Sequence, residues 1–84
     1  MPTISTFYGI VIMMHLRNKE HNPPHIHASY CDETASFFIS TGDVYEGSLP
    51  KRAQNLVKEF VLKYQKELFD MWENEKYTKL KGLE

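Results

Sequence analysis

Gly47-Ser48-Leu49-Pro50 is the stretch that divides this chain into two halves of different structure. Ser48 is a good helix N-cap, and Pro50 in the first turn of a helix sacrifices no hydrogen bond. Beyond it, apolar residues recur at intervals of three and four as far as Trp72. The sequence therefore predicts one long helix over residues 48–75, whose apolar side packs against the rest of the domain.

Residues 1–46 carry patterns that are typical of strands. Short apolar runs and alternating runs are separated by turn residues, and connections this short favour antiparallel neighbours. The predicted strands are Phe7–Leu16, His25–Tyr30, Thr34–Ser40 and Val44–Glu46. We therefore expect an α+β fold, in which a three- to four-stranded antiparallel β-meander packs against one long C-terminal helix.

Length and composition place the chain in a narrow class. Its 84 residues predict one domain over residues 1–84, ending in a tail at 76–84 that frays unless Leu80 and Leu83 dock. The net charge of −1 gives no general attraction to nucleic acid or to an anionic membrane. A single cysteine, Cys31, excludes an intrachain disulfide, and the N-terminus lacks the basic region of a secretory signal. These features predict a cytoplasmic protein without a membrane anchor.

The segment His21-Asn22-Pro23-Pro24-His25-Ile26-His27 holds three of the four histidines. On a strand, His25 and His27 project from one face with Cα atoms about 6.5–7 Å apart, close enough to share one ion. His21 could reach across the proline loop and supply a third nitrogen, as in catalytic zinc sites. One hypothesis is therefore a divalent metal site, with zinc bound by His21, His25 and His27. His15, inside an apolar strand, is expected in the core.

The same residues fit two other hypotheses. His21 and His25 could act as base and acid in cleaving an RNA phosphodiester, with Arg17, Lys19 or Lys51 facing the phosphate. Alternatively, the histidines are structural and donate ring N–H groups to loop carbonyls that the prolines leave unpaired. The candidate binding residues are His21, His25, His27, Arg17 and Lys51.

Several segments together resemble a known bacterial family. In chain order, these segments and residues are Met1-Pro2-Thr3-Ile4-Ser5, Phe7-Tyr8-Gly9-Ile10, His21 to His27, Glu46-Gly47-Ser48-Leu49-Pro50, Ala53, Val57 and Trp72. The most specific of them is the His-Asn-Pro-Pro-His-x-His segment. The chain closely resembles domain-of-unknown-function family 4160. The resemblance implies a compact prokaryotic protein, often encoded beside another small protein in an arrangement similar to toxin–antitoxin pairs. It implies no catalytic residue.

The resemblance and the histidines together give the functional hypotheses. The first is a toxin-like or partner-binding component of a two-gene, toxin–antitoxin-like system that acts through the His-rich loop and strand. The alternatives are a metal-binding protein with a three-His site and a structural or dimerisation module with purely structural histidines. The partners to consider are the small protein encoded next to it, RNA and a second copy of the chain. The near-neutral charge counts against RNA.

Overall fold

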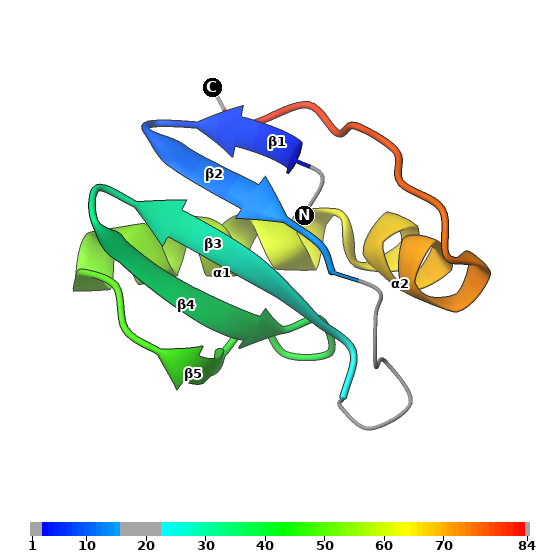
Figure 1. Cartoon of the computed structure of the whole chain (residues 1–84), viewed down its shortest axis with the longest axis horizontal. Helices are drawn as coiled ribbons and strands as arrows, with labels where there is room; N and C mark the ends of the chain where they lie inside the picture. The colour runs from blue at the N-terminus through cyan, green and yellow to red at the C-terminus, as the bar shows by residue number, and fades with distance from the viewer. Residues whose placement is uncertain (1–2, 16–22, 84) are drawn as a thin grey trace.

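Five antiparallel strands lie in the sheet in the order in which they occur along the chain (Figure 1). The computed structural model describes residues 3–15 and 23–83, and the statements below concern these residues. The elements are β1 (Thr3–Phe7), β2 (Ile10–Met13), β3 (His25–Tyr30), β4 (Glu33–Phe38), β5 (Val44–Gly47), α1 (Lys51–Lys63) and α2 (Gln65–Asn74). The predicted α+β meander is confirmed in outline, although the numbers of strands and helices differ.

The additional strand comes from a hairpin that the sequence prediction missed. Tyr8 and Gly9 both have positive φ, 49° and 79°, and they turn the chain back so that Phe7 pairs with Ile10. Positive φ at both central residues is what a two-residue hairpin loop of type I′ requires. The predicted strand from Phe7 to Leu16 is therefore wrong, because its first residue belongs to β1 and its pairing begins anew at Ile10.

The core lies between one face of the sheet and α1, which runs behind the strands in Figure 1. Alternate strand residues such as Ile12, Ile26 and Phe37 are fully buried on this face. From α1, Phe60 stacks on Phe7 with ring centroids 5.0 Å apart. The apolar residues that recur every second position in the strands and every three to four positions in the helix thus form one core.

The predicted single helix is divided in two. The helical segment begins at Lys51 with Pro50 as its N-cap, so Ser48 does not cap it, and no side chain bonds to the cap. Tyr64 leaves helical conformation, and the side-chain amide of Gln65 donates to the carbonyls of Ile39 and Ser40. These bonds anchor the junction to the end of β4, and α2 then lies at the end of the sheet where β3 begins (Figure 1). Neither helix is long and apolar enough to cross a membrane.

The segment after α2 docks along the outer edge of β1. The backbone N–H of Leu80 donates to the carbonyl of Ile4 at 2.9 Å, and Leu80 and Leu83 pack against the core. An edge strand with unpaired backbone groups can pair with other chains, and a docked segment prevents this. The tail is therefore part of the fold.

Candidate functional site

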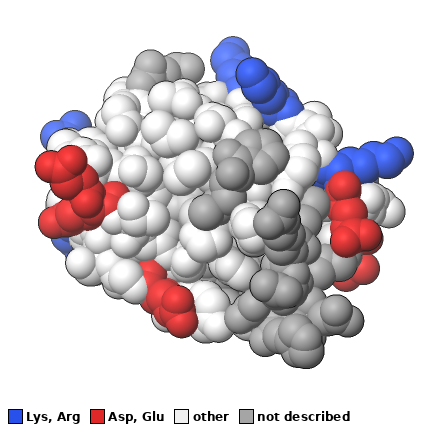
Figure 2. Space-filling view, viewed as in Figure 1, with Lys and Arg blue, Asp and Glu red and all other residues white. Residues whose placement is uncertain are grey.

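The face of the sheet opposite α1, called the outer face below, carries the histidine strand. Its residues alternate with the core residues along each strand: Val11, Met13, His25, His27, Ser29, Thr34, Ser36, Phe38 and Glu46. In the sheet register, His27 lies between Met13 of β2 and Ser36 of β4, and Ser36 lies opposite Glu46. Figure 2 views the molecule from this side, with charged side chains around the rim and an uncharged centre among the described residues.

His25 is held in place from several sides. It is only 9% exposed, and its ring centroid lies 5.4 Å from that of Trp72 and 5.6 Å from that of Tyr45. Its Nδ1 lies 2.8 Å from the carbonyl oxygen of Pro23. Because a carbonyl can only accept, Nδ1 carries a proton, and in the neutral ring Nε2 keeps the lone pair. His25 therefore ties the end of the proline loop to β3.

His27 is the more accessible of the two histidines. Its ring centroid lies 5.0 Å from that of His25, and its Nδ1 forms a 3.2 Å hydrogen bond with Oγ of Ser36. Burial lowers the pKa of His27 below 6.5, nearby His25 and His15 lower it further, and Glu46 opposes the shift. His27 is therefore a neutral imidazole at pH 7. His15 is half-buried rather than in the core, so its predicted place is wrong.

The predicted site residues are only partly brought together. His25 and His27 share one face, as the alternation in β3 predicted. Lys51 instead lies on α1, on the other side of the sheet, near Asp43 and Val44. His21 and Arg17 lie outside the described residues, so the roles predicted for them stay predictions.

The rings around His25 were not identified by sequence reasoning. Trp72 was assigned only to the apolar stripe of the helix, and Tyr45 sits on the last strand, far from His25 along the chain. Ser36 could have been found, because pairing β3 with β4 through the short turn at Cys31-Asp32 places it beside His27. The contact with Trp72 depends on the helix break at Tyr64, for which the sequence carries no plain signal.

The chemistry available to the described residues is that of two imidazole rings, His25 and His27, next to aromatic side chains. Within residues 3–15 and 23–83, no three His, Cys, Asp or Glu side chains are placed to hold one metal ion. The three-His zinc site and the pairing of His21 with His25 in catalysis both need His21. What the described residues provide is a surface with an uncharged centre (Figure 2), where the half-buried His27 lies.

Comparison with known proteins gives one match. The model of the family described as "Domain of unknown function (DUF4160)" matches residues 9–73, which is most of the chain and includes β2 to α2. No curated protein and no solved structure matches the chain.

Proposed function

The chain belongs to the DUF4160 family, and on that premise we propose that it is the partner-binding component of a two-gene, toxin–antitoxin-like system. The contact surface is the outer face around His27, and the partner is the small protein encoded beside it. The resemblance to family members that are encoded in pairs suggests the partner. The choice of surface rests on one observation: among the described residues, no charged side chain lies at the centre of the outer face (Figure 2).

The distribution of charge favours a protein partner over RNA. None of the five strands contains a lysine or arginine, and Glu33 and Glu46 are their only acidic residues. Binding to a phosphate backbone depends on several cationic contacts. The centres of protein interfaces, by contrast, are depleted in charged residues. Among the described residues, the outer face presents Met13, His27 and Ser29 without a nearby cation, and such a surface is better suited to binding a protein than to binding RNA.

The hydrogen bond of His25 supports a structural role for that residue. Its ring donates to the Pro23 carbonyl and is packed between Trp72 and Tyr45, so it is not placed to make contact with a partner. His27 is half-buried rather than buried, so a partner can reach its ring. We therefore propose that His25 maintains the local structure of the site and that His27 contacts the partner.

The test is co-expression with the product of the adjacent gene, followed by size-exclusion chromatography and calorimetry. We expect a stable complex. Ser29→Arg places a cation on the outer face and should weaken binding at least tenfold, which is about 1.4 kcal/mol. Asn55→Arg is the matched control, because it adds the same charge at an exposed position of α1, away from the outer face. It should leave the affinity within about twofold of the wild-type value.

Two results would contradict the proposal. One is the absence of any complex when both proteins are folded. The other is equal binding by Ser29→Arg and Asn55→Arg, which would move the interface off the outer face. Growth arrest on expression of the chain alone, relieved by the adjacent gene, would assign the toxin role to this component.

A metal site is the second candidate, and one observation favours it. His25 and His27 face the same side with ring centroids 5.0 Å apart, and neutral imidazoles are common zinc ligands. Calorimetric titration with zinc should then show stoichiometric binding that His27→Gln abolishes. Absence of heat at micromolar zinc would remove this candidate without affecting the first.

A further inference from the structure

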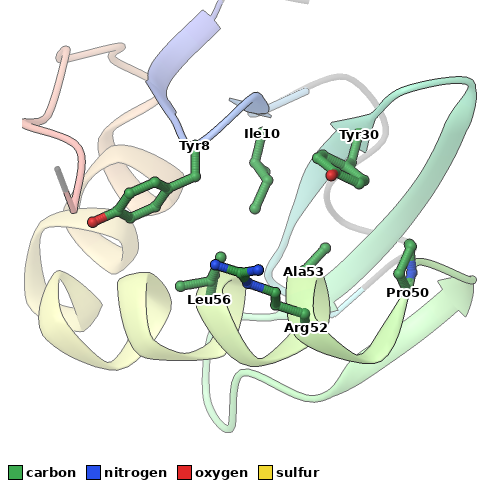
Figure 3. A pocket seen from close by; sticks show the side chains of 7 residues that line it. All are labelled: Tyr8, Ile10, Tyr30, Pro50, Arg52, Ala53 and Leu56. Atoms are coloured by element: carbon green, nitrogen blue, oxygen red, sulfur yellow. The ribbon is translucent and has the colours of Figure 1, made fainter.

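A concave site lies at the other end of β3, away from the histidines. It has a volume of about 450 Å³ and is lined by Tyr8, Ile10, Tyr30, Pro50, Arg52, Ala53 and Leu56. Figure 3 shows Arg52 reaching from α1 along this cleft, with Tyr8 on one side and Tyr30 on the other. Pockets of about 300–1,000 Å³ with apolar walls and a few polar groups are the usual size of small-molecule sites.

The cleft is separate from the outer face. His25 begins β3 and Tyr30 ends it, so the two are about 17 Å apart along the strand at about 3.4 Å per residue. Tyr30 also points to the same side of the sheet as Ile26 and Ala28, whereas His25 and His27 point to the other side. A ligand in the cleft would therefore not touch the surface proposed for the partner.

Tyr8 adds an independent observation, because its backbone is in a conformation that large residues avoid. Its φ is 49°, and its side chain is 52% exposed although it is aromatic. For a bulky residue, positive φ costs about 1–2 kcal/mol, and such strain is concentrated at functional sites. An Asn at this position would suit the turn better, yet the chain places an aromatic ring at the mouth of the cleft.

Arg52 supplies the charge. It is exposed in the first turn of α1, and within the described residues it forms no ion pair. The remaining lining residues are apolar or aromatic and none is acidic. A guanidinium beside an apolar wall suits a ligand with a carboxylate, which it can bind through two parallel hydrogen bonds.

We propose that this cleft binds a small aromatic carboxylate. The flat ring of the ligand packs against Leu56 between Tyr8 and Tyr30, and its carboxylate binds the guanidinium of Arg52. Aromatic faces favour offset or edge contacts with a planar ligand. The volume admits a ligand with one or two fused rings.

The test is a titration with 2-naphthoate, followed by backbone amide shifts in two-dimensional NMR. We expect saturable shifts confined to residues 8–10, 30 and 51–56, with a dissociation constant on the order of 0.1–1 mM for a ligand this small. 2-Naphthamide has the same shape without the charge and should bind at least fivefold more weakly.

Two variants test whether Arg52 is the residue that binds the carboxylate. Arg52→Gln should weaken 2-naphthoate binding about five- to tenfold and leave 2-naphthamide binding unchanged. Lys51→Gln is the matched control, because Lys51 is the adjacent exposed cation but lines a different hollow, and it should leave both affinities unchanged. Absence of saturable shifts overturns the proposal. Equal binding of the acid and the amide, or equal effects of the two variants, overturns the assignment to a carboxylate at Arg52.

Discussion

At the scale of single residues, His25 is the side chain that most depends on its surroundings. His25→Ala removes the bond to the Pro23 carbonyl and the packing against Trp72 and Tyr45. We expect it to lower the free energy of unfolding by about 2–4 kcal/mol, from the lost bond and the cavity together. Urea denaturation at pH 7, followed by circular dichroism, measures this difference.

Ser29→Ala is the control for His25→Ala, because it lies on the same strand face and is only half-buried. It should change the free energy of unfolding by less than about 0.5 kcal/mol. If His25→Ala were as stable as wild type but lost the partner, His25 would be a contact residue, and the structural role assigned to it would be wrong.

His27 makes stability depend on pH. Because its pKa in the folded protein is lowered from 6.5, the unfolded chain binds more protons as the pH falls through 6.5. The free energy of unfolding should therefore fall as the pH drops below 6.5 and level off below the lowered pKa. The slope from this one group cannot exceed about 1.4 kcal/mol per pH unit.

His27→Gln isolates this effect. The variant keeps a polar side chain that can bond to Ser36 but cannot titrate. Urea denaturation at several values between pH 5 and pH 7.5 should give a shallower dependence for His27→Gln than for the wild type. Parallel curves would show that His27 titrates in the folded protein as it does in the unfolded chain.

At the scale of elements, the sequence predicted the strands that show alternation between clear turn residues, and it missed the hairpin that lacks such a signal. Alternation and turn residues located β3, β4 and β5 to within two residues, and they correctly placed His25 and His27 on one face. The hairpin between β1 and β2 was missed because tyrosine is not a residue that signals positive φ. The contact between His25 and Trp72 could not be predicted, since it joins distant elements through tertiary packing.

The junction between α1 and α2 is a second feature that depends on tertiary contacts. Gln65 donates to two carbonyls at the end of β4, whereas Gln54 makes a single local bond to Leu49. Gln65→Ala should cost about 1–3 kcal/mol for two lost bonds, and Gln54→Ala about half as much. Urea denaturation gives the totals, and amide hydrogen exchange should show that Gln65→Ala loosens α2 selectively. Equal costs would mean that the helix break does not depend on Gln65.

Two glycines with similar φ allow a matched comparison of strand ends. A Cβ on Gly47 would lie 2.5 Å from the carbonyl oxygen of Thr34, whereas one on Gly9 would meet only the Tyr30 ring at 3.5 Å. Placing alanine at either position costs about 1 kcal/mol because of the positive φ, but only Gly47→Ala also forces backbone atoms apart. Gly47→Ala should therefore lose at least about 1 kcal/mol more than Gly9→Ala in urea denaturation. Similar losses would show that β5 can shift away from β4 without cost.

At the scale of the whole molecule, β3 connects two surfaces that face opposite sides. His27 near its start faces the proposed partner, and Tyr30 at its end lines the cleft beside α1. Because the two sites share no side chain and lie on different faces, binding at one should leave affinity at the other unchanged. Under these two proposals, the protein partner and the carboxylate would bind independently, although β3 contributes residues to both sites.

We expect the edge of β1 to govern whether copies of the chain associate. Removing residues 79–84 would delete the bond from Leu80 to Ile4 and the packing of Leu80 and Leu83. Partial burial of two leucines predicts a loss of about 2 kcal/mol in the free energy of unfolding. The same deletion bares the backbone groups of β1, which can then pair with a second copy.

We therefore expect the truncated chain to associate as its concentration rises, as measured by sedimentation velocity, while the full chain stays monomeric. Thr6→Lys is the informative second change, because it places a charge on the exposed edge strand. A lysine on an edge opposes pairing between strands, so it should restore the monomer in the truncated chain without restoring its stability. Association that persists with Thr6→Lys would place the contact elsewhere, and the outer face around His27 would be the surface to test next.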